Sequence, residues 1–573
     1  MVVPSPLYFS RPDIVHPHLS IRHAIPSPLD HHSFIFVAPI SALDNDTDAQ
    51  QQSGPLILDR QGDLIWCGAA EVGSVSSTTT FDLCEWEGDP ALCLFRGQKR
   101  SAVGYGQGVV LDRHYQEIAV IDADDGPIDL HEFRTSPSGT VLFTTYRPWP
   151  YDLGLDHGVG WVLDSGFGEI DLRQRGRSAS FTWNALTHFN ISESAIPLRS
   201  YPEIFGSGRS HRDAFDFFHI NSVDKDDHGN YLISARHTDS VYLISGKDGT
   251  VLWQLGGKNS WFHGPGAEFR RQHHARYRSG NGSHTLITLF DNTSDGYSLI
   301  GSESRGVEIS LNHYTMAATV QRQFTAFQPG GLLAHGMGSL QMGSNGEAMA
   351  CFGSNATITI FDRNNQAMLD ASFDDRFLLY RASVHSWSGS PRRPPNVWAY
   401  ARTPHSAIHV YVSWNGASGV EFWNFYVADE PGSYRLAGTK QRTGFETNFT
   451  CDINAGQASL VIAEAVGYDG ARRNSSPSSP FMPPENLASQ CGEAHCFTQS
   501  TFNYRLRSSS STTLRGPESP VQGGCAKSSL PGLRLRLAQA MAAGLFLMLV
   551  YMIGRRYWTT QRRYQDGNCN ITY

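Results

Sequence analysis

The chain has 573 residues and a net charge of −8, with 40% hydrophobic and only 17% charged residues. It is too long for one compact core and too apolar to be wholly disordered. The acidic balance, without a basic block in the first 500 residues, argues against nucleic-acid binding. The 55 glycines and 29 prolines lie between short runs of aliphatic and aromatic residues, which is typical of a turn-rich β protein.

One pattern recurs along the first two thirds of the chain. An apolar run, a turn of the form D-x-x-G or N-G and a second apolar run follow one another, as in GPLILDRQGDLIW at 54–66. Such turns supply the positive φ that tight hairpins require. Repetition at about 40–55 residues predicts sheets arranged around an axis. We therefore predict an all-β fold, with a six-bladed β-propeller over residues 4–394.

The pattern changes after this region. Residues 395–468 hold dense β-type runs, with a hairpin-like Asn415-Gly416, and predict a small β-sandwich-like module that closes or flanks the propeller. Residues 470–531 are rich in Ser, Pro and Arg, and predict a flexible, disordered stalk.

A long apolar run follows the stalk. Residues 537–553 read LAQAMAAGLFLMLVYMI, and at ~1.5 Å per residue they would extend about 25 Å, the lower limit for crossing a bilayer. They predict a single transmembrane helix, although a buried or amphipathic helix is the alternative. More arginines follow the run than precede it, so residues 554–573 are expected to be a short basic cytoplasmic tail.

Cysteines and glycosylation signals bear on the compartment. None of the nine cysteines belongs to a CxxC pair, so we expect disulfides of open pairing with at least one cysteine left over. N-x-S/T acceptors predict a glycoprotein; they are Asn45, Asn190, Asn281, Asn292, Asn355, Asn448 and Asn474. We expect a single-pass membrane protein with its bulk extracellular or in the secretory lumen. That placement requires a signal peptide that the first residues do not resemble; without one, the bulk would be cytosolic.

Propellers gather polar groups from several blades at one end of the central channel. Candidate residues at the ends of predicted strands are His131, His219, Asn221, Arg236, His273, His274 and His335. Each histidine alone would more often be a structural core residue. Together, imidazoles and a guanidinium suit an anionic group with several oxygens, and an imidazole can attack as a nucleophile. A metal site is the other reading, but carboxylates at ligand spacing are not evident.

Several motifs then carry a resemblance. They are YFSRPDIVHP, GPLILDRQGDLIW, DLHEF, HINSVDKDDHGNYLISAR, QHHAR, LFDN and SWNGA. Across residues 8–428 the chain resembles the arylsulfate sulfotransferase (arylsulfotransferase, ASST) family, in particular a fungal-type, membrane-anchored branch. The resemblance implies a six-bladed propeller. It also implies transfer of a sulfuryl group from a phenolic sulfate ester to an acceptor phenol, independent of 3′-phosphoadenosine phosphosulfate and of any cofactor or metal.

The resemblance also implies roles for the candidate residues. His273 in the QH motif would attack sulfur, while His131, His219 and Arg236 would stabilise the group in transfer. Asn221 would bind substrate. The motif in this sequence reads QHH, so His274 is expected either to bind substrate or to replace His273 as nucleophile.

Two other functions stay open. A non-catalytic, membrane-anchored propeller that binds a ligand or glycan would share the anchor, stalk and ring of sheets. A different propeller enzyme, such as a quinoprotein-type dehydrogenase, would carry a bound quinone. The natural donor and acceptor, the oligomeric state and the disulfide pairing are not predicted.

Overall fold

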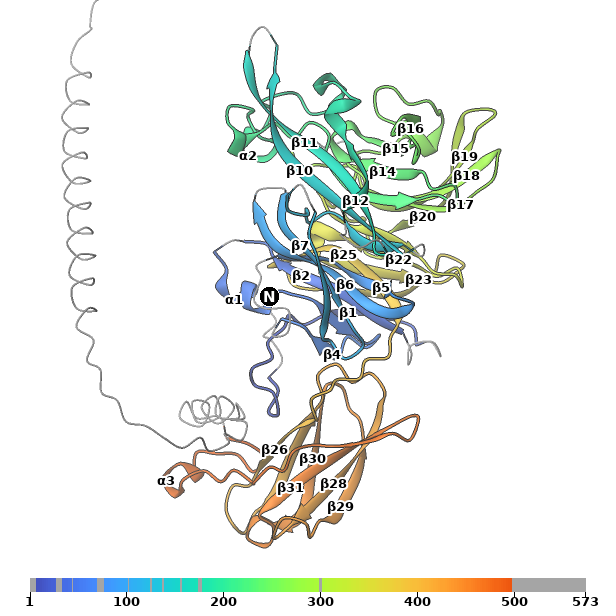
Figure 1. The fold of residues 1–573 in the computed structure, drawn as a ribbon. Coiled ribbons are helices and arrows are strands. Elements are labelled where there is room, and N and C mark those ends of the chain that lie inside the picture. Colours follow the sequence, from blue (N-terminus) through green and yellow to red (C-terminus); the bar gives the residue numbers. More distant parts are fainter. Residues whose placement is uncertain are drawn as a thin grey trace, which may run out of the picture. The chain divides into compact units, whose positions relative to one another are not determined.

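The computed structural model describes residues 7–26, 33–43, 45–69, 77–100, 103–123, 126–136, 139–154, 157–173, 178–297 and 301–496. Within these ranges antiparallel sheets predominate (Figure 1). The α-helices are short: α1 (Thr47–Gln52), α2 (Pro202–Phe205) and α3 (Glu485–Ala488). Single 3-10 turns are η2 (Ala185–Thr187), η3 (Ile191–Glu193), η4 (His211–Asp213), η5 (Arg236–Thr238), η6 (Pro265–Ala267), η7 (Gly353–Asn355) and η8 (Ala455–Gln457).

Six sheets follow one another along the chain. The first holds β25 (Phe377–Ser386), β2 (Ser33–Ser41), β3 (Leu56–Leu58) and β4 (Leu64–Cys67). The second holds β5 (Ser77–Trp86), β6 (Asp89–Arg100), β7 (Val103–Leu111) and β8 (Glu117–Ile121). The third holds β9 (Phe133–Ser136), β10 (Thr140–Asp152), β11 (Val159–Asp171) and β12 (Ala179–Asn184).

The other three sheets have the same up-and-down order. The fourth holds β13 (Ile220–Lys225), β14 (Tyr231–Ala235), β15 (Ser240–Ile244) and β16 (Val251–Gly256). The fifth holds β17 (His273–Gly280), β18 (His284–Asp291), β19 (Arg305–Asn312) and β20 (Ala317–Thr325). The sixth holds β21 (Ser339–Met342), β22 (Ala348–Phe352), β23 (Thr357–Phe361), β24 (Ala367–Ser372) and, at its outer edge, β1 (Ser20–Ala24).

The six sheets form a closed, propeller-like ring. Successive sheets contact one another through β5 and β9, β10 and β13, β13 and β17, β17 and β21, and β21 and β25; β25 then contacts β5. The ring closes because strands from the two ends of the region pair: β25 with β2, and β24 with β1. The prediction of an all-β, propeller-like fold is confirmed.

The repeated turns have a common physical cause. Asp59 Oδ1 accepts hydrogen bonds from the backbone N–H groups two and four residues ahead, and Gly62 takes a φ of 84°. Asp226 does the same ahead of Gly229, at a φ of 83°. A short acceptor followed by a residue that tolerates positive φ therefore sets these hairpins, as the D-x-x-G pattern predicts.

Two further sheets, C-terminal to the ring in the chain, share one apolar core. The three-stranded sheet holds β26 (Asn396–Tyr400), β27 (Ala407–Ser413) and β30 (Glu446–Asn454). The four-stranded sheet holds β29 (Arg435–Gln441), β28 (Val420–Ala428), β31 (Leu460–Gly467) and β32 (Arg472–Asn474). Val410, Trp423, Phe425 and Cys451 are among the buried residues between them.

Residues 470–496 differ from the expected stalk. β32 pairs with β31, and the Phe481 backbone bonds to Ala399 and Ala401 beside β26, so backbone pairing overrides the low-complexity composition. The rest of the predicted stalk, the predicted span at 537–553 and the tail at 554–573 lie outside the described residues. Within the part of the chain that the structure describes, no helix is both long and apolar enough to span a membrane.

Disulfides are present, as predicted. Cys84 and Cys93 join β5 to β6, and Cys491 bonds to Cys496. Cys351 and Cys451 are buried in the cores of their sheets and form no disulfide.

A buried carboxylate links four of the six sheets. Glu132, which precedes β9, is 1% exposed, and its oxygens accept bonds from Arg381 of β25 at 2.7 Å, Arg276 of β17 at 2.7 Å and the Val223 N–H of β13 at 3.2 Å. Burial opposes ionisation, but the two guanidinium groups outweigh it and lower the pKa of Glu132 to about 2. Glu132 is therefore a charged hub inside the ring.

We expect Glu132→Gln to destabilise the ring by about 3–5 kcal/mol, because Arg276 and Arg381 would lose their buried counter-ion. Urea unfolding followed by tryptophan fluorescence measures this. Glu117→Gln, which removes an exposed carboxylate paired with Arg96, is the matched control and is expected to cost less than about 1 kcal/mol. Equal losses of stability from the two substitutions would refute the role of Glu132 as a stabilising hub.

Candidate functional site

Four of the residues singled out from the sequence meet inside the ring. His131 lies two residues before β9, His219 directly before β13, and His273 begins β17. Arg236 follows β14 as the first residue of η5. Three neighbouring sheets thus each contribute side chains from the ends of their inner strands, and the positive charge of Arg236 acts on His273.

The rings in this cluster are packed against one another. The centroids of His131 and His219 are 4.6 Å apart, edge to face, and His219 stacks on His237 at 4.5 Å. Tyr146 of β10 lies 5.3 Å from His131 and 5.7 Å from His219. Tyr146 and the rings of His131, His219 and His237 are all buried, so packing sets the geometry of the cluster.

Carboxylates orient the two flanking histidines. His131 Nδ1 lies 2.5 Å from Asp129 Oδ1, and His219 Nδ1 lies 2.5 Å from Asp216 Oδ2. Each carboxylate is an acceptor, so each Nδ1 carries the hydrogen. In His219, which burial keeps neutral, the lone pair therefore resides on Nε2.

His273 is oriented in the same way by neutral acceptors. Its Nδ1 lies 2.7 Å from Asn292 Oδ1 and 3.1 Å from the Arg271 carbonyl. Asn292 presents its oxygen because its Nδ2 donates to the carbonyls of Ala334 and Met337. His273 Nε2 therefore has the lone pair, which accepts a bond from the Met337 N–H at 3.2 Å.

Arg236 supplies the positive charge of the cluster. It is half-buried, and it donates to His237 Nε2 at 2.9 Å and to the carbonyl of the exposed His335 at 3.0 Å. His237 Nδ1 in turn donates to the Asp216 carbonyl at 2.6 Å. Burial, with the nearby Arg271, lowers the pKa of Arg236 to about 10, so it remains charged near neutral pH.

The imidazoles of His273 and His219, by contrast, are kept neutral. Burial is the main cause that places the pKa of His273 well below its usual range, with the charge of Arg236 as the next. Burial likewise lowers the pKa of His219, followed by His131 and Arg236. The site thus combines a permanent cation with neutral nitrogen lone pairs, which suits a group that is anionic and electrophilic.

Asn221 lies beside the cluster in β13. Its Nδ2 donates to the Gln272 carbonyl at 2.7 Å, and its backbone carbonyl accepts bonds from Arg381 and Tyr380. Its Oδ1 is buried without a hydrogen-bond partner. Arg381 also donates to the carbonyl of His131 at 2.8 Å, so the Glu132 hub holds the backbone of both residues.

His274 is set apart from the other candidates. The charges that act on it are those of Arg276, Arg381 and Arg134, which belong to the surroundings of the hub, and burial with these charges lowers its pKa. Its Nδ1 is buried without a partner. Although His274 follows His273 directly in β17, the two rings therefore have different surroundings.

Sequence reasoning missed four residues of the site. Asp129 and Asp216 stand two and three residues before the histidines they orient, a D-x-H or D-x-x-H spacing that could have identified them. His237 follows Arg236 directly. Asn292 matches the glycosylation pattern, but it is 0% exposed and its amide is fully used around His273, so that interpretation is wrong for this position.

One group in the described ranges has the composition of a metal site. Candidate ligand atoms of Asp216, His219 and His237 lie within 4.8 Å of one another. Both imidazole Nδ1 atoms, however, point their hydrogens at oxygens of Asp216, at 2.5 and 2.6 Å. As arranged, these nitrogens offer no lone pair to an ion.

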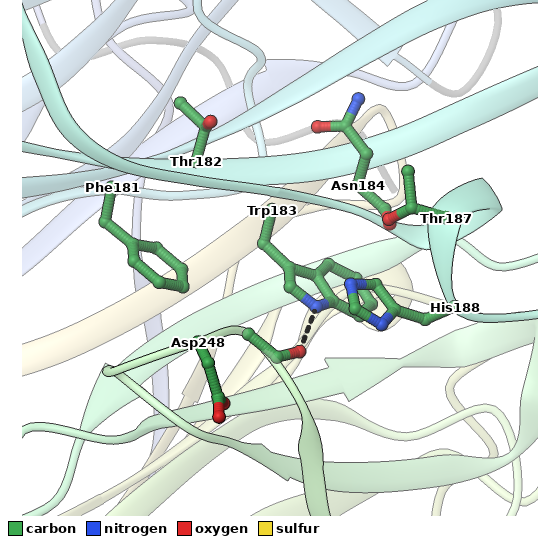
Figure 2. A pocket seen from close by; sticks show the side chains of 8 residues that line it. Phe181, Thr182, Trp183, Asn184, Thr187, His188 and Asp248 are labelled. Atoms are coloured by element: carbon green, nitrogen blue, oxygen red, sulfur yellow. Dashed lines mark hydrogen bonds between the residues drawn. The ribbon is translucent and has the colours of Figure 1, made fainter.

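An open pocket of about 280 Å³ lies away from the cluster, at the outer strand β12 (Figure 2). Trp183 donates to the Gly249 carbonyl at 3.0 Å, and its ring stacks on His188 at 4.9 Å. The indole is only 3% exposed. The indole that lines this pocket thus already makes its contacts within the protein.

Comparison with known families decides the assignment. The family model described as "Arylsulfotransferase (ASST)" matches residues 86–374. The chain belongs to the arylsulfotransferase family. The matched range contains the clustered histidines, Arg236 and Asn292, and family membership indicates a sulfotransferase enzyme acting on small molecules.

Other comparisons add little. No curated protein matches the chain. A protein of unknown function from Bacteroides caccae shares 12% identity, covering 61% of this chain and 98% of its own, with a TM-score of 0.34. A protein from Lactobacillus plantarum shares 11%, covering 73% and 99%, with a TM-score of 0.31. Likenesses of this size say nothing of function.

The buried histidines predict acid sensitivity. His219, His237, His273 and His274 all have a pKa well below 6.5 in the folded protein, chiefly through burial. Below about pH 6.5 the unfolded chain binds protons that the folded chain does not. The free energy of unfolding therefore decreases as the pH is lowered, by about 1.4 kcal/mol per pH unit for each histidine. Urea midpoints at about pH 7.5, 6.5 and 5.5 measure this loss.

His274→Gln serves as the matched variant for this prediction, because it removes one of these histidines outside the cluster. Its stability should depend less steeply on pH than that of the unchanged protein. A flat stability between about pH 7.5 and 5.5 in the unchanged protein would contradict the prediction.

Proposed function

We propose that this arylsulfotransferase-family protein transfers a sulfuryl group from a phenolic sulfate ester to an acceptor phenol through a sulfohistidine at His273. The observation that carries the proposal is the orientation of His273. Asn292 and the Arg271 carbonyl hold its Nδ1–H, so that the lone pair is on Nε2, where it accepts the Met337 N–H that substrate would displace. Arg236 is the adjacent cation. In this proposal the six sheets are the blades of the propeller of a fungal-type, membrane-anchored branch.

The first half-reaction forms the Nε2–S bond and breaks the S–O(aryl) bond. The Met337 N–H that bonds to Nε2 in the resting site is then free to donate to a sulfuryl oxygen. Arg236 offers a planar pair of donors to the same group. Preorganised donors of this kind are commonly worth ~10²–10³ in rate.

The leaving aryl oxygen keeps the bonding electrons and takes a proton. That proton comes from solvent, so the Nε2 of a neighbouring imidazole, His131 or His219, whose Nδ1–H is held by Asp129 or Asp216, stays open to a proton. In the second half-reaction the acceptor phenol gives its proton to that Nε2, which passes it to solvent, and the phenol oxygen attacks sulfur. No cofactor is needed for the balance.

A location in the secretory pathway or at the cell surface, with the predicted span as anchor, is part of the proposal. The disulfides Cys84–Cys93 and Cys491–Cys496 support an oxidising compartment. The non-catalytic ligand-binding alternative is not favoured, because a binding scaffold does not require neutral imidazoles aligned around a guanidinium.

Substitution of the nucleophile tests the reaction. We expect His273→Ala to lower transfer from 4-nitrophenyl sulfate by ~10³-fold or more, because no sulfohistidine can form. His274→Ala is the matched control and should retain most of the transfer. Full activity of His273→Ala would refute the assignment.

Intact mass gives a reading independent of turnover. Incubation of the unchanged protein with 4-nitrophenyl sulfate should add one sulfuryl group, mapped to the peptide that contains the QHH motif. Absence of labelling across several aryl sulfates would reject the sulfohistidine.

The pH dependence of transfer is a further test. His273 reacts as the neutral form, and its pKa is lowered, so kcat/KM should stay level from about pH 7.5 down to below pH 6. A pH profile with 4-nitrophenyl sulfate as donor measures this. Loss of activity with a midpoint near pH 6.5 would show that the nucleophile has the ordinary pKa of an exposed histidine, and would contradict the prediction.

A further inference from the structure

Two tyrosines form an exposed aromatic pair on the described surface. Their ring centroids, those of Tyr201 and Tyr297, are 4.7 Å apart, and the side chains are 44% and 49% exposed. They come from separate segments: Tyr201 precedes α2 with a left-handed φ of 47°, and Tyr297 follows β18 in the loop that begins at Asn292. Large rings held together in solvent are unusual unless another surface or ligand covers them.

Rings connect this pair to the cluster of histidines. Phe205 of α2 lies 6.5 Å from Tyr297 and 5.0 Å, edge to face, from His237. His237 Nε2 accepts the bond from Arg236. The exposed pair is therefore connected to Arg236 through two buried rings, those of Phe205 and His237.

The loop that carries Tyr297 is fixed beside Arg236. Asp295 accepts from the Tyr297 N–H at 2.9 Å and pairs with Arg271 at 3.2 Å, and its charge is among those that favour ionisation of Arg236. Ser294 bonds to the exposed His335 ring, and the His335 carbonyl accepts from Arg236. The loop of Tyr297 is thus bonded through Ser294 to His335, the residue whose carbonyl accepts from Arg236.

We infer that Tyr201 and Tyr297 bind the aromatic ring of the phenolic substrate while its sulfate or hydroxyl oxygen reaches Arg236 and His273. This inference rests on the proposed function and adds the residues that select an aryl over an alkyl ester. In a ping-pong reaction the donor and the acceptor occupy the same site in turn, so the pair serves both. Stacked and edge-to-face aromatic contacts favour a flat ring over a flexible chain of equal area, by about 3–10-fold in affinity.

Binding to a chain that cannot turn over tests the pair directly. In full-length His273→Ala, calorimetry gives Kd for 4-nitrophenyl sulfate and for hexyl sulfate. Tyr297→Leu and Tyr201→Leu, each added to this background, should weaken the aryl ester about 3–10-fold and the alkyl ester less than about 2-fold. Tyr297→Phe should recover most of the aryl affinity.

Tyr314, 82% exposed on the turn between β19 and β20, provides the matched control, since Tyr314→Leu removes an equally large ring far along the fifth sheet. It should change neither Kd. An equal loss for both esters would show that the pair merely supports the site, and unchanged affinities would show that it does not contact substrate; either result overturns the inference.

The outcome is separable from the proposed function. With His273 present, the two leucine substitutions should raise KM for the aryl donor and for the acceptor phenol, with kcat nearly constant. If the unchanged protein transfers no sulfuryl group, yet the aryl preference in binding disappears in the leucine variants, the proposed reaction fails while the binding site stands.

Discussion

The pairing of Glu132 with Arg276 and Arg381 is the interaction on which the rest of the structure depends. These residues come from widely separated parts of the chain, and they meet where the inner strands of several sheets converge. A buried ion set of this kind adds little net stability compared with apolar packing, but it cannot lose one member without leaving an uncompensated charge. It therefore specifies how the sheets are placed relative to one another more than how tightly each one folds.

That placement reaches the candidate site through Arg381. Its guanidinium bonds to the carbonyl oxygens of both His131 and Asn221 as well as to Glu132. His131 and His219 sit in different sheets, so their ring separation of 4.6 Å is a property of the ring of sheets rather than of either motif. A small shift between sheets would separate the nitrogens that must act on one substrate.

Burial then determines the protonation state of the cluster. Each of the three histidines directs Nδ1–H at an oxygen, whether a carboxylate or the amide of Asn292, so that its Nε2 faces away from that oxygen. Burial lowers the pKa of His273 and His219, yet it leaves the guanidinium of Arg236 charged. Neutral nucleophile and permanent cation therefore coexist at one pH, which an exposed histidine near a carboxylate would not achieve.

Local turn chemistry explains how much of the fold was predictable. The D-x-x-G turns around Asp59 and Asp226 depend on residues within four positions of each other, and the sequence pattern identified them. The pairing of β25 with β2 joins positions more than 300 residues apart, and no local signal records it. Residues 472–474 have the composition of a linker, yet they extend a sheet because β31 offers an unpaired edge.

The site was predictable to a similar extent and for similar reasons. The chemistry of the site can be inferred from residue types, because imidazole has a nucleophilic lone pair and guanidinium is a planar cation. The predicted strand ends then point to His131, His219, Arg236 and His273. Asn292, which orients His273, cannot be inferred in this way, because it matches a glycosylation acceptor until its burial is known. His273 and His274 are adjacent in sequence, and the structure distinguishes them: the His273 ring bonds to Asn292 and the Met337 N–H, whereas the Nδ1 of His274 is buried without a partner.

Two residues beside His273 adopt backbone conformations that are locally unfavourable. Arg271 and Met337, neither of them glycine, adopt left-handed φ values of 56° and 61°, a conformation that costs about 1–3 kcal/mol at such residues. They are the two residues whose backbone bonds to His273: the Arg271 carbonyl accepts from Nδ1, and the Met337 N–H donates to Nε2. Arg271 is held in place by ion pairs with Asp239 at 2.8 Å and Asp295 at 3.2 Å. Part of the backbone strain therefore lies where it aims one imidazole, and Asp295, which pairs with Arg271 and accepts from the Tyr297 N–H, links this part of the site to the loop of Tyr297.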